Sequence, residues 1–226
     1  MTGLSSPVGG ILWLMRAPPT TERGRLTRQR IVAAATEVVA EKGAVGASLD
    51  EVGARAPASR SQLYHYFDDK TDLLRAVAKA TNDTVLDGQQ ALFAGLGTWA
   101  GFQRWADALV GLQTRRGGRG GCPMANLVAQ LGERDDDTRM VLASGFDRWE
   151  AHIRAGLAAL VSSGDLRPET NIDWLAASTL ASLQGGLMLT QARRDPQMLR
   201  LALDGALTLI GTYRETSANA ETSSER

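Results

Sequence analysis

Apolar residues recur along this chain at the three- and four-residue spacing of an α-helix. A predicted helix from Thr27 to Gly43 carries one apolar face, formed by Ile31, Ala34, Ala35, Val38 and Val39. Glycine suits the position just beyond a helix end, so Gly43 is expected to stop this helix. Since no segment shows convincingly the two-residue alternation of a half-buried strand, the pattern predicts an all-α fold.

Two short helices are predicted next, each opened by its own capping residue. Ser48 is followed three residues later by Glu51, and Ser59 three residues later by Gln62. In such a box the hydroxyl accepts from a backbone amide while the acid or amide side chain reaches back to the serine N–H. Pro57 ends the first helix and leaves a turn. Together with the preceding helix, the two capped helices predict an N-terminal three-helix bundle that contains a helix-turn-helix.

The second half of the chain is predicted to form a larger helical domain. Asp69 is expected to cap a long connecting helix from Lys70 to about Asp87. A helix over residues 138–161 then carries an apolar stripe formed by Leu142, Phe146, Trp149, Ile153, Leu157 and Leu160. The helix from Ile172 to Arg194 adds a face of small residues. Its glycines cost about 1 kcal/mol each relative to alanine, which predicts close packing against another helix.

The second capped helix presents side chains that suit DNA. Arginine pairs bidentately with guanine and glutamine with adenine in the major groove, while serine, tyrosine and histidine reach phosphate oxygens. An ordinary solvated helix is the alternative. The predicted DNA-binding residues are Arg25, Arg28, Ser48, Ser59, Arg60, Ser61, Gln62, Tyr64, His65 and Lys70.

Charge and cysteine content narrow the function classes. The 226 residues carry 25 basic and 25 acidic side chains, so any attraction to nucleic acid has to be local. Residues 16–30 supply it with five arginines against the single acid Glu22, and they are interpreted as phosphate contacts or as a solvated basic tail. One cysteine excludes an internal disulfide, and no cysteine and histidine cluster offers a metal site.

No catalytic site and no cofactor are predicted. His65 lies on the presumed reading helix, His152 stands apart, and nothing resembles a nucleophile with its base. The glycine- and arginine-rich loop at residues 114–123 lacks the preceding strand and the following lysine of a nucleotide-binding loop. The apolar run from Ile11 to Met15 is too short to span a bilayer and lacks the basic start of a secretory signal, so a cytoplasmic protein without membrane contact is expected.

From Thr27 to about Leu74 the sequence resembles the DNA-binding domain of the tetracycline-repressor (TetR) family, most specifically in the stretch LYHYFDDKTDLL. Two later segments, GCPMANL near residue 121 and SLQGGLMLTQARRD near residue 182, are similar to segments of one large subset of that family. Pro57 stands where the family usually has glycine. Glycine there often supplies a positive φ, which proline is not expected to adopt.

Four segments are expected along the chain. They are a flexible extension over residues 1–22, a helix-turn-helix DNA-binding domain over 23–74, a ligand-binding and dimerisation domain over 75–215, and a disordered tail over 216–226. The tail is polar and built of small residues, which do not bury enough apolar surface to fold.

The resemblance implies a homodimer that binds a palindromic double-stranded operator and is released by a small, hydrophobic effector. It assigns dimer pairing to the two last long helices, at Phe146, Ile153, Ala177, Ala181 and Gly185. It also implies an effector cavity, for which the bulky apolar candidates are Trp99, Phe102, Trp105, Met124, Trp149 and Met188. Core packing within one subunit is the alternative for every residue in both sets.

Cys122 allows a second interpretation. It precedes Pro123, a residue favoured at the first position of a helix, so its thiol would lie at a positive helix N-terminus near three arginines, which favours the thiolate. A repressor that senses oxidants or electrophiles is one alternative, and a buried, inert cysteine is the other. A helical adaptor that associates with DNA nonspecifically is the remaining rival.

Overall fold

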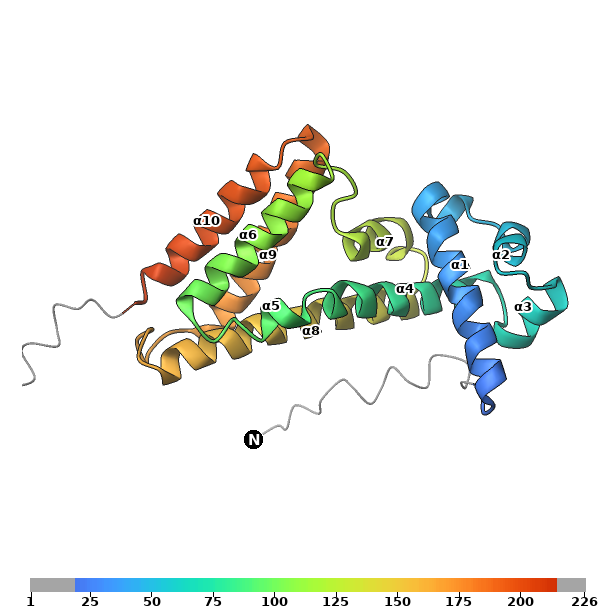
Figure 1. Cartoon of the computed structure of the whole chain (residues 1–226), viewed down its shortest axis with the longest axis horizontal. Helices are drawn as coiled ribbons and strands as arrows, with labels where there is room; N and C mark the ends of the chain where they lie inside the picture. The colour runs from blue at the N-terminus through green and yellow to red at the C-terminus, as the bar shows by residue number, and fades with distance from the viewer. Residues whose placement is uncertain (1–18, 215–226) are drawn as a thin grey trace, which may run out of the picture. The chain divides into compact units, whose positions relative to one another are not determined.

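A computed structural model describes residues 19–214 of the chain. These residues form ten α-helices and no β-strand, which confirms the all-α prediction (Figure 1). The predicted disordered tail and most of the predicted N-terminal extension, including Arg16, lie outside the described residues. Within residues 19–214, no helix has both the length and the apolar character needed to span a membrane.

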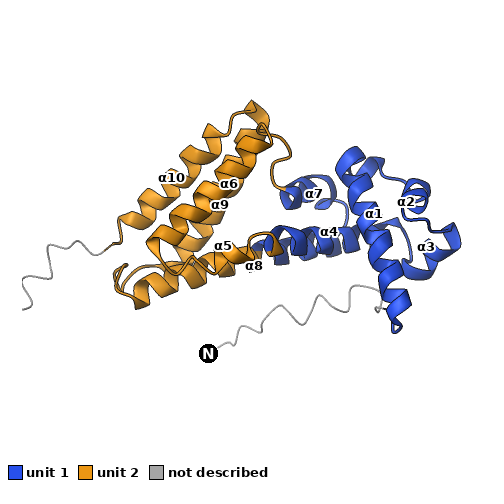
Figure 2. Cartoon of the chain, in the orientation of Figure 1, with its two compact units in different colours: residues 1–86, 123–146 blue, residues 87–122, 147–226 orange. Residues whose placement is uncertain are grey.

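The chain divides into two compact units, and neither is continuous in sequence (Figure 2). Unit 1 contains residues 1–86 and 123–146, and unit 2 contains residues 87–122 and 147–226. The helix α8 (Asp136–Ser162) begins in unit 1 and ends in unit 2. The predicted boundary between residues 74 and 75 was drawn between a DNA-binding and a ligand-binding domain and does not coincide with the border of a compact unit at residue 86. This division by function stays a prediction.

Unit 1 holds the predicted three-helix bundle. Its remaining helices are α1 (Glu22–Gly46), α2 (Leu49–Arg55), α3 (Arg60–Tyr66), α4 (Lys70–Asp87) and α7 (Pro123–Leu131). The predicted capping residues Ser48 and Ser59 open α2 and α3, and the bounds of α4 agree with those predicted. Their shared core contains the apolar face predicted for α1, all of it at most 8% exposed, together with Val52, Leu63, Phe67, Leu73 and Val77.

The start of α1 was predicted wrongly. The helix begins at Glu22 rather than Thr27, because the Thr21 hydroxyl accepts a hydrogen bond from the Gly24 N–H at 3.1 Å and acts as the N-cap. The Thr27 hydroxyl lies inside the helix and donates to the Arg23 carbonyl instead. Thr21 followed by an acidic first-turn residue was the sequence signal for this start.

Helix α1 breaks at Gly43, as predicted, and the break is held by a side chain from α7. Gly43 has φ 77° and ψ 162°, after which one further turn runs to Gly46. The Gln130 side-chain oxygen accepts a hydrogen bond from the Ala44 N–H at 2.6 Å. A Cβ at Gly43 would lie 2.8 Å from the same oxygen, so glycine meets both the backbone and the space requirements here.

Unit 2 is built around two helices that lie side by side, α9 (Ile172–Arg193) and α10 (Gln197–Gly211) (Figure 1). Helix α6 (Trp99–Arg115) packs against α10, and the short α5 (Gln90–Phe93) packs against α6. A Cβ at Gly186 would lie 2.8 Å from the Ala202 Cβ and 3.1 Å from Leu199. The small residue at this position therefore allows α9 and α10 to approach closely, as its helical position predicted.

We expect Gly186→Ala to destabilise the protein. Overpacking of a close helix contact costs about 2 kcal/mol, which exceeds the roughly 1 kcal/mol that alanine gains in helix propensity. The free energy of unfolding, measured by urea denaturation followed by circular dichroism, should fall by about 1 kcal/mol.

Gly205→Ala is the matched control, because a Cβ at Gly205 on α10 would meet no described atom within 4 Å. There the gain in helix propensity acts alone, and the free energy of unfolding should rise by about 0.5–1 kcal/mol. Equal effects of the two substitutions would contradict the close contact at Gly186.

Candidate functional site

The helix α3 has a complete capping box, as the sequence predicted. The Ser59 hydroxyl accepts from the Gln62 N–H at 3.2 Å, and the Gln62 side-chain oxygen accepts from the Ser59 N–H at 2.9 Å. The Gln62 oxygen is therefore engaged at the helix N-terminus. Its bidentate pairing with adenine would require both amide atoms, so the structure favours a capping role for this side chain.

The box predicted at Ser48 forms only in part. The Ser48 hydroxyl accepts from the Glu51 N–H at 3.2 Å, but the Glu51 carboxylate turns to Lys42 and to the Ser48 hydroxyl rather than to the Ser48 N–H. The hydrogen bond from Lys42 is the main cause of a lowered pKa at Glu51. On the same side, Arg55 forms two hydrogen bonds with Glu41, at 2.7 and 2.8 Å, and a longer ion pair with Glu37 at 3.8 Å. Together with the Lys42–Glu51 pair, these ion pairs tie α2 to α1.

The turn between α2 and α3 is tight and strained at Pro57. The Ala58 N–H donates to the Gly53 carbonyl at 2.9 Å, and a Cβ at Gly53 would lie 2.8 Å from the Ala58 oxygen. Pro57 has φ 25°, although its ring prefers a φ near −65°. The position thus keeps the positive φ for which glycine is suited, contrary to the expectation that proline would exclude it.

One face of α3 is buried and the other is exposed. Leu63 and Phe67 are each 2% exposed and belong to the core of unit 1. The predicted reading residues Arg60, Ser61, Gln62, Tyr64 and His65 are all exposed. Tyr64 stands out because it is a large aromatic residue with 46% of its surface open to solvent. We call this exposed side of α3 the reading face.

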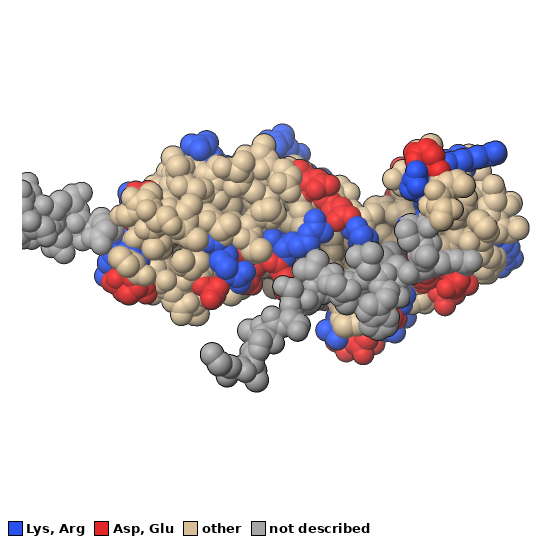
Figure 3. Space-filling view, turned by 90° about the horizontal axis from the view of Figure 1, so that it is seen from below, with Lys and Arg blue, Asp and Glu red and all other residues tan. Residues whose placement is uncertain are grey.

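The residues predicted to contact phosphate are placed less uniformly. Ser48 and Ser59 are exposed at helix N-termini, and Lys70 is half-buried and donates to the Val45 carbonyl at 3.0 Å. Arg25 is exposed and pairs with Glu22, so the basic cluster is partly neutralised. Arg28 is half-buried, whereas a phosphate contact was expected to be exposed. On the face seen in Figure 3, basic and acidic side chains are interspersed over a largely neutral surface.

Most of the predicted effector residues are buried. Phe102, Trp105 and Met124 are fully buried, and Trp149 is 2% exposed. Trp105 donates to the Gln89 side-chain oxygen at 3.0 Å, whereas the Trp149 indole N–H has no acceptor among the described residues. Such an unsatisfied buried donor calls for an explanation.

Two residues of the effector prediction lie elsewhere. Met188 is 64% exposed on α9, so its assignment to a buried cavity was wrong. Trp99 is only half-buried, and its ring lies under the Arg214 guanidinium, whose carbon is 4.9 Å from the ring centroid. The periodicity of a helix shows which positions share a face, but it does not show what covers that face.

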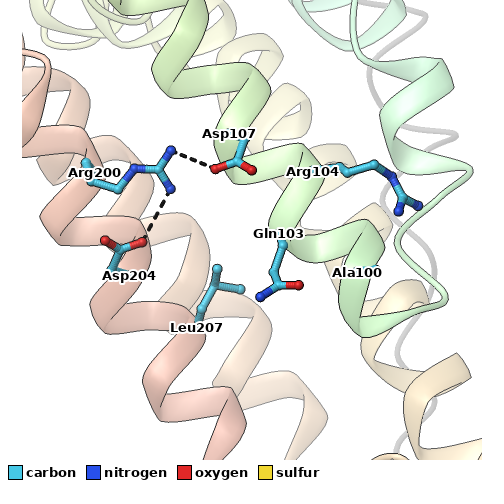
Figure 4. A pocket seen from close by; sticks show the side chains of 7 residues that line it. All are labelled: Ala100, Gln103, Arg104, Asp107, Arg200, Asp204 and Leu207. Atoms are coloured by element: carbon cyan, nitrogen blue, oxygen red, sulfur yellow. Dashed lines mark hydrogen bonds and ion pairs between the residues drawn. The ribbon is translucent and has the colours of Figure 1, made fainter.

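A surface groove of about 400 Å³ lies between α6 and α10 (Figure 4). Arg200 forms ion pairs there with Asp107 at 2.7 Å and Asp204 at 3.4 Å, and the hydrogen bond that Arg200 donates to Asp107 is the main cause of its raised pKa. Gln103 and Leu207 point toward one another beside these three charged residues, while Arg104 points away from them. Because these charges satisfy one another, the groove differs from the apolar cavity that the sequence predicted.

The exposed side of α9 is unusually apolar. It carries the small residues Ala177 and Ala181, with Trp174 at 49% exposure near one end and Met188 at 64% near the other. A Cβ at Gly185 would meet no described atom within 4 Å, so this glycine, unlike Gly186, lies beside open space. We call this surface, from Trp174 to Met188, the small-residue face.

The predicted interface residues of α8 differ from this pattern. Ile153 is fully buried and Phe146 half-buried, so Ile153 packs in its own subunit and its assignment to the interface was wrong. The apolar stripe of α8 is its core stripe. Ala151 and Ala155 are the exposed alanines near the middle of α8, and no apolar periodicity marked them.

The glycine-rich loop before α7 contains the single cysteine. Gly117, Gly118, Gly120 and Gly121 all have positive φ, which explains the need for glycine there. Cys122 is 5% exposed directly before Pro123, the first residue of α7. Its burial agrees with a packing role and limits direct attack by a soluble oxidant.

Two family models match the chain in separate regions. The model described as bacterial regulatory proteins, tetR family, matches residues 31–77, and the model described as tetracyclin repressor-like, C-terminal domain, matches residues 99–206. The first match contains the whole helix-turn-helix, and the second contains α6, α7, α8 and α9 in full.

Individual proteins agree with these matches. An HTH-type transcriptional regulator of Lactococcus lactis subsp. lactis is 26% identical over 80% of this chain and 91% of its own length. The transcriptional regulator AcuR of Cereibacter sphaeroides is 26% identical over 80% of this chain and 88% of its own. The crystal structure of a TetR-family regulator from Cytophaga hutchinsonii superposes with a TM-score of 0.76 and 18% identity, covering 88% of this chain and all of that one.

We expect Pro57→Gly to stabilise the protein. Relief of the strained φ is worth about 1–3 kcal/mol, while the added freedom of the unfolded chain costs about 1 kcal/mol. The midpoint of thermal unfolding, measured by circular dichroism, should therefore rise by about 2–4 °C. Pro57→Ala is the control. Alanine is strained at a positive φ because of its Cβ, so this variant should be less stable than the glycine variant. A glycine variant no more stable than the original protein would contradict the strain at this turn.

Proposed function

The chain belongs to the TetR family of DNA-binding transcriptional regulators, and from this premise we propose that it is a dimeric repressor. Two copies of α3 read a palindromic operator, and a small, hydrophobic effector releases the protein from it. The observation that carries the proposal is the reading face of α3, which is polar and exposed while Leu63 and Phe67 fix its other side in the core.

Dimerisation follows from the limits of one short reading helix. A single helix-turn-helix contacts only a few base pairs, which gives little selectivity against a genome of competing sites. Two such helices one turn of DNA apart, or a multiple of it, read a palindrome in successive major grooves. The proposed dimer therefore needs a surface on which a second copy packs.

The small-residue face of α9 is the surface we assign to this contact. Large exposed apolar residues at both ends favour burial, and the small residues between them let a partner helix approach closely. Arg154 on α8 forms an ion pair with Asp173 on α9 at 2.6 Å, so these helices are neighbours within unit 2. Ala151 and Ala155 on α8 then replace Ile153 as its proposed interface residues.

Effector control is proposed to act as a population shift. The buried apolar residues Phe102, Trp105 and Trp149 of unit 2 are the proposed contacts for the effector, which binds one conformation of the dimer while the operator binds the other. Met124, the remaining buried candidate, lies on α7 in unit 1, where the Gln130 side chain of the same helix accepts a hydrogen bond from the Ala44 N–H of α1. The description of the C-terminal model as repressor-like supports repression.

We expect Arg60→Ala to relax sequence specificity. Loss of one bidentate contact to guanine costs about 1–3 kcal/mol at the correct sequence and little at a random one. The test compares affinities, by fluorescence anisotropy, for a duplex selected from a randomised library by the unmodified protein and for a random duplex. The ratio of the two affinities should fall about tenfold or more.

Lys70→Ala is the control for a phosphate contact. It should weaken binding to both duplexes about equally and leave their affinity ratio unchanged. If Arg60→Ala also left the ratio unchanged, α3 would not be the reading helix, and the helical adaptor with nonspecific DNA association would be the better account.

We expect Ala181→Glu to separate the dimer. A carboxylate in the middle of the small-residue face would be desolvated without a partner, and both copies would carry it in a symmetric interface. Sedimentation velocity should show a monomer, and affinity for the selected duplex should fall at least tenfold, because one reading helix is lost. Leu201→Glu on the exposed side of α10 is the control, at 63% exposure, and should leave the dimer intact. A dimeric Ala181→Glu variant would place the interface elsewhere.

A further inference from the structure

Arg28 occupies surroundings unlike those of the other arginines in the first turns of α1. Arg23, Arg25 and Arg30 are exposed, but Arg28 is half-buried. Its guanidinium carbon lies 5.0 Å from the centroid of the Phe67 ring, within the range of a cation–π contact. Phe67 is the C-cap residue of α3, so Arg28 lies against the end of the reading helix.

A buried carboxylate interacts with the same arginine. Asp72, in the first turn of α4, is 6% exposed, and its Oδ2 atom accepts from the Asp68 N–H at 3.2 Å. Burial lowers the pKa of Arg28, and the negative charge of Asp72 opposes that lowering. Asp72 also donates its own N–H to Asp69 at 2.8 Å, which fixes the start of α4.

The charged groups of this cluster are not fully satisfied. Among the described residues, neither the Arg28 Nε nor the Asp72 Oδ1 atom has a hydrogen-bond partner. A donor and an acceptor that stay buried and unpaired cost stability, which a hydrophobic side chain at either position would avoid. Their presence at the junction of α1, α3 and α4 therefore indicates a role other than stability.

We propose that Arg28 is a positioning residue for DNA recognition, which fixes the C-terminal end of α3 through Phe67 and Asp72 and contacts no phosphate itself. The inference rests on the proposed function and revises the sequence-based assignment of Arg28. Helix α3 has only 7 residues, and its N-terminus is fixed by the Ser59 box. The contact at Phe67 sets the orientation of its other end.

Orientation matters here because base contacts are geometrically strict. Bidentate pairing of an arginine with guanine requires both donors to meet both acceptors, and tolerates displacements of about 0.5 Å or rotations of about 10–20°. A reading helix that rocks about its N-terminal end would keep nonspecific attraction to the backbone and lose discrimination between sequences.

The test uses two substitutions that separate charge from stacking. Arg28→Lys keeps the positive charge but loses the planar group that stacks on Phe67, and Arg28→Met keeps apolar contact without charge. Arg25→Gln removes one charge at an exposed position of the same helix and is the control. Affinity for the library-selected duplex and for a random duplex is measured by fluorescence anisotropy at several NaCl concentrations.

A positioning role predicts that Arg28→Lys lowers the ratio of selected to random affinity about tenfold, the size of one weakened base contact. For Arg28→Lys, the slope of log affinity against log salt on the random duplex should equal that of the original protein. For Arg28→Met, the slope should equal that of the Arg25→Gln control, which also lacks one positive charge. A phosphate contact predicts the opposite result. Arg28→Lys would then keep the ratio, and Arg28→Met would lose about 0.9 of slope beyond the control.

Asp72→Asn provides an independent variant. It removes a negative charge, so electrostatics alone would leave random binding as strong or stronger, whereas loss of positioning lowers the affinity ratio. The double variant of Arg28→Lys with Asp72→Asn should lose no more of the ratio than the worse single variant, because both act through one cluster. Circular dichroism melts show whether each variant is folded at the assay temperature. If either Arg28→Lys or Asp72→Asn is unfolded there, the affinity ratio of the other variant decides the test.

The possible failures are distinguishable. If library selection with the original protein yields no preferred sequence, the proposed function fails. If the original protein selects a sequence and Arg28→Lys keeps the ratio within about twofold, only the positioning role of Arg28 is overturned.

Discussion

Burial of Leu63 and Phe67 is the interaction on which the proposed function of this molecule depends. A helix of two turns has almost no stability of its own, so α3 exists as a helix only because these side chains enter the core shared by α1, α2 and α4. The same burial decides which residues face outward. Five polar side chains are thereby presented on one rigid surface, and the chemistry of that surface suits base edges and phosphate oxygens.

Local signals in the sequence predicted local structure well. Capping residues gave the starts of α2 and α3, because caps act through neighbouring amides only, and Pro57 gave the end of α2. The same reasoning missed Thr21 as the cap of α1. Long-range contacts could not be predicted, since nothing in the pattern placed Gln130 of α7 against Ala44, or Arg28 over Phe67. The apolar character of Met188 did not show that its side chain is exposed on α9 rather than buried in a cavity.

Two adjacent glycines of α9 show how one helix serves two kinds of contact. Gly186 faces α10 within the chain, and Gly185 faces open space on the other side, among small and apolar residues. The proposed dimer and the internal packing of unit 2 thus use opposite sides of the same helix. Within unit 1, the Gln130 side chain of α7 closes the break in α1 and so ties α7 to the DNA-binding bundle.

The most direct measurement is DNase footprinting of the purified protein on the DNA upstream of its own gene, with and without excess random duplex. Two symmetric reading helices predict protection of an inverted repeat whose half-sites lie one helical turn of DNA apart, or a multiple of it, and which survives the competitor. Protection that is uniform, or that random duplex abolishes, would contradict sequence-specific reading by α3.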